Sequence, residues 1–248
     1  MVEGSQRAGA SERGVFITFE GGDGAGKSTH LQFVAEALRS RGLEVVCLRE
    51  PGGTIIGEQL RQVLLDPGNY IMSDACELLI YEAARAQLVA QVIVPALNRG
   101  AIVLSDRFAD STVAYQAYGR GLDRSFVDRA NAFACQGIWP DRTIVMMTGG
   151  DAECGLERAT QHKHADRLEM AGIEFHERVN ASFLHLADVD PGRVRVVVSD
   201  ESKAATARKV FDQVADVDDR LAWMADRTVC TDAFFEALVL QRETMGRG

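Results

Sequence analysis

The sequence lacks segments typical of a membrane-bound or exported protein. Its apolar stretches are as short as a strand or are interrupted by charged residues, and residues 1–13 contain no apolar core of a signal peptide. Runs of lysine and arginine are also absent, and the formal net charge of −9 argues against nonspecific binding to nucleic acid. We therefore expect a cytoplasmic protein that binds neither a membrane nor nucleic acid.

The cysteine content argues against two further classes of protein. The five cysteines form an odd set without CxxC or Cys/His spacing: Cys47, Cys76, Cys135, Cys154 and Cys230. A disulfide framework pairs an even number of cysteines, and a zinc site needs metal-ligand spacing of this kind, so neither is predicted. The pattern favours small, buried or half-buried apolar side chains.

The sequence does contain the alternation of elements that is typical of an α/β fold. Apolar β-rich runs alternate with longer segments of helical period, and the runs lie at residues 15–19, 44–48, 101–105, 142–147 and 194–198. Gly42 and Gly100 follow two helical segments, where a helix C-cap is expected. We predict a mostly parallel sheet flanked by helices, in one domain over residues 14–216.

The two ends of the chain differ from this central part. Residues 1–13 are polar and rich in Gly, Ser and Ala, which predicts a disordered leader. Residues 217–248 carry an apolar cluster at helical spacing that includes Phe234, Phe235 and Leu238, which predicts an appended helix. Such a helix packs either on the body of the protein or on a partner subunit, and the pattern does not distinguish the two.

A glycine-rich segment joins the first predicted strand to a helical segment. It matches GxxxxGK[ST] and consists of Gly21, Gly22, Asp23, Gly24, Ala25, Gly26, Lys27 and Ser28, followed by Thr29. Glycines let backbone N–H groups surround phosphates, and the helix N-terminus adds partial positive charge. We expect this segment to bind ATP, with Lys27 reaching the β and γ phosphates. The alternative is a glycine-rich turn without a ligand.

Two oxygen ligands for Mg²⁺ are predicted beside this segment. Ser28 supplies a hydroxyl, and Asp106 follows the strand predicted at 101–105. The alternative for Asp106 is a carboxylate that caps a helix. The motif leaves the acceptor of the phosphoryl group open, because GTPases, ATPases, nucleoside kinases and nucleotide kinases share it.

The helix predicted over residues 77–98 offers a candidate acceptor site. Tyr81 and Arg85 lie one turn apart on one face, so the aromatic ring can stack on a base while the guanidinium binds it. The alternative for Tyr81 is a core aromatic, since apolar stripes on helices usually pack in a core. The helix alone therefore does not decide the acceptor.

Six characteristic segments follow one another along the chain. They are FITFEGGDGAGKST at 16–29, REPGGT at 49–54, GEQLRQVLLD at 57–66, ELLIYEAARAQLV at 77–89, SDRFADSTVAYQAYGRG at 105–121 and DRLE at 166–169. Together they resemble the thymidylate kinase family over residues 14–213. The resemblance implies a P-loop nucleoside monophosphate kinase fold with a five-stranded parallel sheet, flanking helices and a lid at about 158–168. It also implies a homodimer that uses Mg²⁺ and ATP to convert dTMP to dTDP for DNA synthesis.

The resemblance further implies roles for the residues of the acceptor site. Tyr81 is expected to stack on thymine, and Arg85 to bond a base carbonyl. Arg61 and Arg107 are expected to bind the acceptor's phosphate, because a guanidinium fork suits phosphate oxygens. The other expected contacts are Thr112 and Gln116 at the base edge, Tyr115 at the 2′ position, Asp23 near the 3′ hydroxyl and the transferred phosphate, and Glu50 and Pro51 along the pocket.

The catalytic cations are expected to come partly from the lid. Gly24 stands where some members of the family carry an arginine, so a basic lid of the bacterial type must supply that charge. The expected catalytic set is Lys27, Asp23, Arg107, Arg158, Lys163 and Arg167. Positions of the lid that are usually Arg-rich hold His162 and His164 here, and histidine is mostly neutral near pH 7.

Two alternatives to dTMP phosphorylation stay open. One is a P-loop kinase of another pyrimidine nucleotide or of a deoxynucleoside, and the other is a nucleotide-binding relative with weak activity. Arg61 and Arg107 favour a phosphorylated acceptor, and Gln116 with Thr112 favours a pyrimidine. The altered lid is the reason for considering weak activity.

Overall fold

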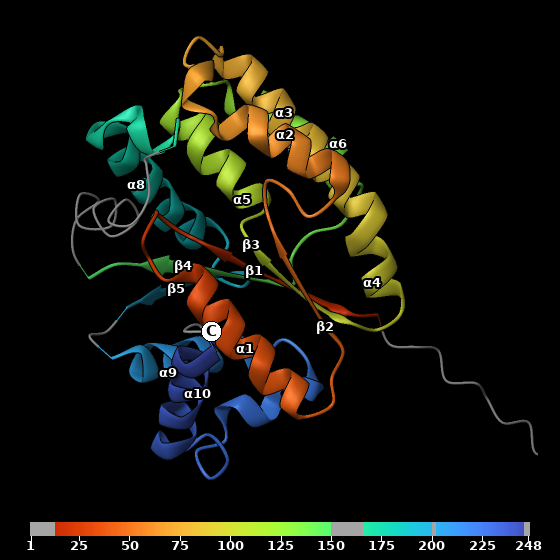
Figure 1. Cartoon of the computed structure of the whole chain (residues 1–248), viewed down its shortest axis with the longest axis vertical. Helices are drawn as coiled ribbons and strands as arrows, with labels where there is room; N and C mark the ends of the chain where they lie inside the picture. Colours follow the sequence, from red (N-terminus) through yellow and green to blue (C-terminus); the bar gives the residue numbers. More distant parts are fainter. Residues whose placement is uncertain (1–12, 150–165, 200–201, 246–248) are drawn as a thin grey trace, which may run out of the picture.

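A parallel β-sheet lies at the centre of the computed structural model, which describes residues 13–149, 166–199 and 202–245. Its five strands run parallel in the order β2-β3-β1-β4-β5 (Figure 1). They are β1 (Val15–Glu20), β2 (Val45–Arg49), β3 (Ile102–Asp106), β4 (Arg142–Met147) and β5 (Val194–Val198). Each strand begins and ends within one residue of its predicted run, so the prediction of an α/β fold with five parallel strands is confirmed.

Helices cover both faces of the sheet (Figure 1). One face carries α1 (Lys27–Ser40), α9 (Lys203–Val214) and α10 (Asp232–Met245). The other carries α2 (Ile55–Leu65), α3 (Asp74–Leu88), α4 (Val94–Asn98), α5 (Ala109–Thr112), α6 (Arg124–Cys135) and α8 (Ile173–Val189). Shorter helical turns lie at Pro67–Asn69, Val89–Ile93, Val113–Gly119, Glu169–Ala171 and Asp219–Ala225.

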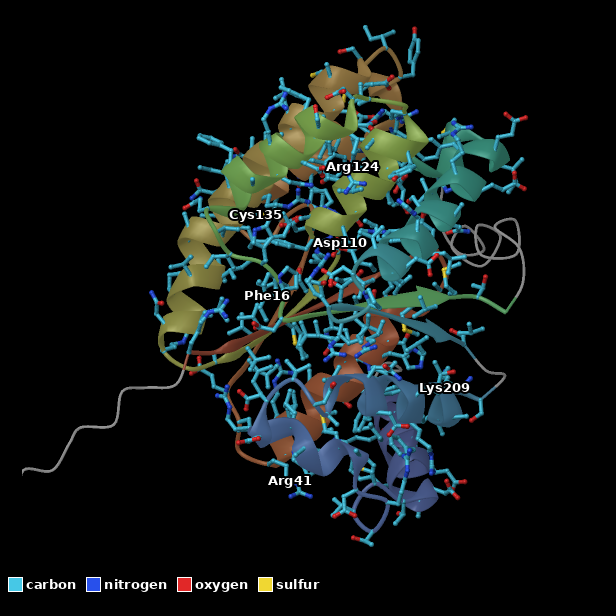
Figure 2. All side chains as sticks on the ribbon, turned by 180° about the vertical axis from the view of Figure 1, so that it is seen from behind. Phe16, Arg41, Asp110, Arg124, Cys135 and Lys209 are labelled. Atoms are coloured by element: carbon cyan, nitrogen blue, oxygen red, sulfur yellow. The ribbon has the colours of Figure 1, made fainter. Side chains whose placement is uncertain are left out.

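The central strand β1 positions the candidate site. All six of its residues are buried, as expected for a strand that is covered by helices on both faces. Phe16, which is labelled in Figure 2, packs edge-to-face on Phe108 at 4.9 Å between ring centroids, on the face of α3 and α4. Phe19 lies in register with Asp106 of β3. The segments after β1 and β3 therefore begin side by side at the carboxyl edge of the sheet, where ligands bind in such folds.

Polar caps begin the helices that surround this edge. Thr54, Ser73 and Asp123 each accept a hydrogen bond from the backbone N–H three residues further on, at 2.9, 3.3 and 2.7 Å. They precede α2, α3 and α6, respectively. Each cap satisfies a donor that has no partner within its own helix, so the start of each helix is fixed locally by the sequence.

One helical stretch also meets the length and composition of a membrane span. Among the described residues, Asp74–Asn98 is the single helix of this kind, with a mean hydropathy of 1.2 over its most apolar window. A core helix meets the same criteria, and this one holds Glu77, Glu82 and Arg85 in the protein interior. The stretch packs along α2 and α6 and forms one wall of the cavity described below.

The segment that follows α9 packs on the body of the protein. Phe235 and Leu238 of α10 join one hydrophobic cluster with residues of α1 and α9, and Phe235 lies 5.1 Å from the ring of Phe211. Arg41, which is labelled in Figure 2 and follows α1, lies over the ring of Trp223 at 4.3 Å. Of the two placements left open by the sequence, the structure shows the one on the body.

Replacement of Phe235 by alanine should therefore destabilise the whole domain. Phe235 is 0% exposed, and removing a buried phenyl ring from a packed core costs about 3–5 kcal/mol. Urea unfolding would measure the difference, with Leu240→Ala as the control because Leu240 on the same helix is 64% exposed and should cost about 0.5 kcal/mol or less. Equal small effects of the two substitutions would show that α10 is not part of the domain core.

Candidate active site

The glycine-rich segment forms a phosphate-sized loop between β1 and α1. Gly21, Gly24 and Gly26 have φ values of 120°, 70° and 87°, a region that other residues rarely adopt. A Cβ on Gly21 would lie 2.0 Å from the carbonyl oxygen of Met146, so this position has no room for a side chain. The loop therefore needs glycine both for its backbone conformation and for its contact with β4.

Lys27 points back into this loop from the first turn of α1. Its Nζ donates to the carbonyl oxygens of Gly21 at 3.1 Å and Gly22 at 2.6 Å. Burial and the nearby charge of Arg107 lower the pKa of Lys27 to about 8, although Asp23 and Asp106 act in the opposite direction. A phosphate placed in the loop would offer this ammonium group a stronger partner than the two carbonyls do.

Ser28 and Asp106 meet at the carboxyl edge of the sheet. The Ser28 hydroxyl donates to a carboxylate oxygen of Asp106, which ends β3. These are hard oxygen ligands beside the phosphate loop, and they fit Mg²⁺, which usually takes one or two protein groups together with phosphates and water. No group of three or more His, Cys, Asp or Glu side chains able to hold a metal occurs among the described residues.

Arg107 connects the phosphate loop to the acceptor side. Its Nη2 lies 2.5 Å from Oδ1 of Asp23, its Nη1 donates to the carbonyl of Gly21 at 3.0 Å, and its guanidinium carbon lies 5.0 Å from the centre of the Tyr115 ring. Burial alone would raise the pKa of Asp23, but the charges of Arg107 and Lys27 hold it below its ordinary value. Asp23 therefore stays ionised and keeps the arginine aimed at the loop.

Glu20 fixes the backbone segment that carries Arg107, and the sequence did not identify it as a site residue. Its carboxyl group accepts hydrogen bonds from the backbone N–H of Phe108 at 2.7 Å and from the Ser111 hydroxyl at 2.5 Å. These bonds hold the segment in which Arg107 adopts the left-handed φ of 74°. Burial, reinforced by the charge of Asp110, raises the pKa of Glu20 to about 8. The only available sequence signal was its position at the end of β1, before the glycines.

The candidate site is a single cavity of about 450 Å³ at this edge. It brings together most of the predicted residues, namely Asp23, Gly24, Lys27, Ser28, Glu50, Pro51, Arg61, Tyr81, Arg85, Asp106, Arg107, Thr112, Tyr115 and Gln116. Its lining also contains residues without a predicted role: Arg49, Leu65, Ser111, Asp166, Leu168 and Glu169. Of the predicted residues outside the lining, Gly21, Gly22, Ala25 and Gly26 lie in the loop, and Thr29 lies in α1.

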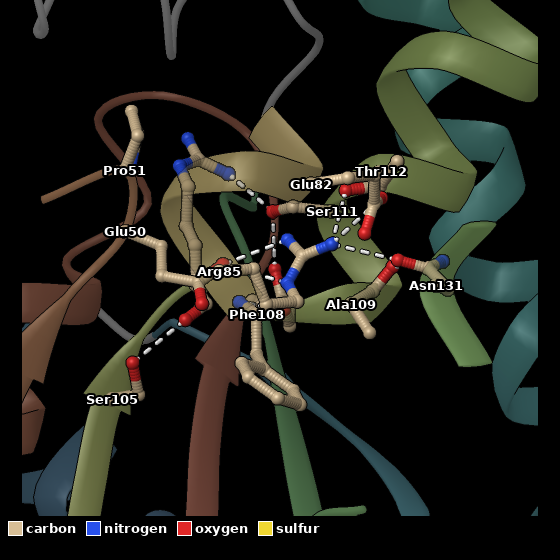
Figure 3. A network of polar contacts seen from close by, with 12 residues as sticks. Glu50, Pro51, Glu82, Arg85, Ser105, Phe108, Ala109, Ser111, Thr112 and Asn131 are labelled. Carbon is tan, nitrogen blue, oxygen red and sulfur yellow. Dashed lines mark hydrogen bonds and ion pairs between the residues drawn. The ribbon is translucent and has the colours of Figure 1, made fainter. Parts of the chain in front are cut away.

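Arg85 is held more tightly than its predicted contact with a base requires (Figure 3). Its Nε and Nη2 both donate to Oε2 of Glu50, at 3.0 and 2.7 Å. Its Nη1 donates to Glu82 at 3.0 Å, to the Thr112 hydroxyl at 2.8 Å and to Asn131 at 2.7 Å. Arg85 is 1% exposed but still lines the cavity. A base in the cavity would thus meet an arginine whose orientation is already fixed.

Two of the side chains that bond to Arg85, Glu82 and Asn131, were not predicted as site residues. Glu82 lies one turn before Arg85 on α3, so its spacing could have indicated the contact. Asn131 comes from α6 and had no sequence signal; its Nδ2 donates to the carbonyl of Ala109 at 3.2 Å, which leaves Oδ1 for Arg85. Burial raises the pKa of Glu50 to about 6 despite the opposing effect of Arg85.

The predicted lid lies largely outside the described residues, and with it Arg158 and Lys163. Arg167 is described, and it faces α3 and α2. Its Nη2 lies 2.5 Å from Oε2 of Glu77, and its Nε donates to the carbonyl of Leu64 at 2.9 Å. Its predicted contact with the transferred phosphate would require a different position of this side chain.

The pKa of Glu20 predicts how stability depends on pH. In the folded protein Glu20 keeps its proton up to about pH 8, whereas an ordinary glutamate releases it near pH 4.5. The folded state therefore binds more protons than the unfolded state between these two pH values, and the wild type should lose stability as the pH rises from one to the other. Glu20→Gln imitates the protonated carboxyl, so relative to wild type it should gain about 1–3 kcal/mol between pH 5 and pH 8. Urea unfolding at both pH values measures this. Glu174→Gln, at an exposed position of α8, serves as control; the same pH dependence in Glu20→Gln and wild type would contradict the assignment.

Comparisons with known proteins agree with this geometry. The family model described as thymidylate kinase matches residues 19–210. A thymidylate kinase from Geobacter sulfurreducens is 46% identical over 205 residues, which are 80% of this chain and 95% of that protein. One from Pseudomonas fluorescens is 49% identical over 180 residues, covering 73% of this chain and 85% of that protein.

A solved structure shows the same fold. The crystal structure of thymidylate kinase from Ehrlichia chaffeensis matches with a TM-score of 0.66 and 31% identity, over 81% of this chain and 98% of that one. The family match ends at residue 210, before α10 begins. The phosphate loop, the cavity beside it and these matches together establish that the chain belongs to the thymidylate kinase family.

Proposed function

We propose that this chain transfers the γ-phosphoryl group of ATP to dTMP and releases ADP and dTDP. The observation that carries this proposal is one continuous cavity in which Lys27 and Asp23 of the phosphate loop face Arg107, Tyr81 and Gln116. A triphosphate bound in the loop and a monophosphate bound against Arg107 would meet inside that cavity. Membership of the thymidylate kinase family supports dTMP as the acceptor.

The donor is bound by the loop after β1. Backbone N–H groups of the glycine-rich segment and the N-terminus of α1 surround the phosphates of ATP, and Lys27 binds the β and γ phosphates. Ser28 and Asp106 are the residues that would hold Mg²⁺. The bound ion would supply positive charge to the phosphate oxygens.

The acceptor's phosphate is bound by arginines. Arg107 is already held by Asp23 and Gly21, and Arg61 lines the cavity with its Nη1 donating to the carbonyl of Pro51 at 2.8 Å. Both guanidinium groups are partly removed from water, which strengthens their interaction with a phosphate. Asp23 approaches the sugar's 3′ side and keeps Arg107 in line with the donor.

The base and the sugar occupy the part of the cavity beside α3. Tyr81 provides the stacking surface, and burial raises the pKa of its hydroxyl, so the ring stays neutral. Arg85 and Thr112, already bonded to each other, read the base edge together with Gln116. The ring of Tyr115 fills the 2′ position and so favours deoxyribose, while Glu50 and Pro51 close the opposite wall.

Catalysis requires alignment and charge neutralisation more than a strong base. The attacking atom is a phosphate oxygen that is already anionic, so no residue has to remove a proton from it. Lys27 and Arg107 neutralise charge from the loop side. Arg158, Lys163 and Arg167 do so from the lid, and Arg167 must leave Glu77 to take part.

The enzyme acts as a cytoplasmic homodimer that binds neither nucleic acid nor a membrane. The adjacent helices α2, α3 and α6 expose large apolar side chains, among them Val63, Leu79, Phe126 and Phe133. The Phe133 side chain, for example, is 86% exposed. Apolar side chains gathered on neighbouring helices are typical of a surface that pairs with another subunit.

The acceptor is tested by ADP release with ATP and a panel of dTMP, dUMP, thymidine, dCMP and dGMP. The account predicts the highest kcat/KM with dTMP and a loss of about 100-fold or more with thymidine, because the arginines around the phosphate would be left without a partner. Lys27→Ala, which removes the cation of the phosphate loop, should abolish turnover and excludes contaminating kinases.

Other outcomes of this assay identify the alternatives. A kcat/KM that is higher with thymidine than with dTMP would identify a deoxynucleoside kinase. A kcat/KM that is higher with dCMP than with dTMP would identify a kinase of another pyrimidine nucleotide. ATP binding without turnover of any acceptor would identify a nucleotide-binding relative without this activity.

A further inference from the structure

Glu77 is a buried carboxylate beside the acceptor cavity, and its only part in the proposed reaction is to release Arg167. It lies on α3, its side chain is 0% exposed, and it does not belong to the cavity lining. Its Oε1 accepts hydrogen bonds from Nε2 of Gln116 at 2.9 Å and from Nε of Arg120 at 3.2 Å. Its Oε2 accepts from Nη2 of Arg120 at 3.0 Å and lies 2.5 Å from Nη2 of Arg167. Glu77 thus joins two arginines to one residue of the cavity.

The surroundings of Glu77 keep this carboxylate ionised. Burial by itself would raise the pKa of Glu77, but the hydrogen bonds from Arg120 and Gln116 and the charges of Arg120 and Arg167 lower it below its ordinary value. An ionised carboxylate only accepts hydrogen bonds. Any neighbour that bonds to Glu77 must therefore present a donor.

This restriction determines how the amide of Gln116 is oriented. A glutamine amide has a donor nitrogen and an acceptor oxygen, and it can turn by half a rotation to exchange them. Only the nitrogen can bond to Glu77, so the carbonyl oxygen is the atom left for the cavity that Gln116 lines. Gln116 is 1% exposed, and turning its amide would place two acceptors against each other in the interior, which is costly.

An acceptor oxygen at this position distinguishes between pyrimidines. Thymine and uracil carry a hydrogen on N3 that can donate to it, whereas N3 of cytosine is itself an acceptor. We propose that Glu77 is a positioning residue that fixes the Gln116 amide with its oxygen toward the base, and that it thereby makes the site selective for a 2,4-dioxopyrimidine over cytosine. The inference rests on the proposed function, because it concerns the base of that acceptor.

The test compares kcat/KM for dTMP with kcat/KM for dCMP, using ATP as donor. In Glu77→Gln the new side chain can donate as well as accept, so Gln116 is free to turn. The preference for dTMP over dCMP should fall about tenfold, the usual worth of one hydrogen bond in recognition. An unchanged ratio in a folded Glu77→Gln protein would overturn the proposal. Absence of dTMP turnover in the wild type would instead contradict the proposed function.

Arg120→Gln provides the matched control. Arg120 bonds to the same carboxylate and does not line the cavity, so this variant loosens the cluster while the bond between Glu77 and Gln116 stays. Its ratio should stay within about twofold of wild type, even where its melting temperature falls. A drop as large as that of Glu77→Gln would show that Glu77 acts only as a structural anchor.

The exchange variant E77Q/Q116E keeps one carboxylate in the pair formed by positions 77 and 116. It replaces Glu77→Gln as the test if that single variant fails to fold. The amide introduced on α3 can donate to the carboxylate that replaces the Gln116 amide, and the second oxygen of that carboxylate is again an acceptor facing the base. The preference for dTMP should therefore be retained, or restored relative to E77Q. Loss of the preference in the folded exchange variant would contradict an acceptor at this position.

Discussion

The guanidinium group of Arg107 lies where the donor loop and the acceptor pocket meet, 2.5 Å from a carboxylate oxygen of Asp23. That position depends on the parallel pairing of β1 with β3, because the phosphate loop continues one strand and Arg107 continues the other. The left-handed backbone of Arg107 is uncommon for a residue with a side chain, and the bonds from Phe108 and Ser111 to Glu20 hold it. Arg107 thus joins the phosphate loop to the segment after β3, and its guanidinium lies beside the Tyr115 ring, whose hydroxyl also donates to Asp23.

The pairing of an arginine with a carboxylate recurs around the cavity, where the carboxylates are buried. Glu50 holds Arg85, and Glu77 holds Arg120 and Arg167. Such pairs contribute little net stability, because removing two charges from water costs about as much as their attraction returns. Their effect is geometric: each fixes the direction of hydrogen-bond donors before a ligand arrives. This preorganisation is what alignment of two phosphates requires.

The strands of the fold and the phosphate-loop side of the site follow from local patterns in the sequence. The strands could be predicted because buried parallel strands are continuous apolar runs, and the phosphate loop because its glycines and Lys27 are adjacent in the chain. Glu20, Glu77 and Asn131 could not be assigned, because each acts through residues between 39 and 91 positions away along the chain. The packing of α10 was undecided for the same reason, since an apolar stripe does not identify its partner.

The direct link between the two halves of the site is tested most closely by Arg107→Lys. Lysine keeps the positive charge but has no guanidinium fork, so it cannot bind Asp23, Gly21 and a phosphate at once. The account predicts a rise of about tenfold or more in the KM for dTMP, with an ATP dissociation constant, measured by calorimetry, within about twofold of wild type. An unchanged KM for dTMP, or an equal loss of ATP affinity, would contradict the role given to Arg107.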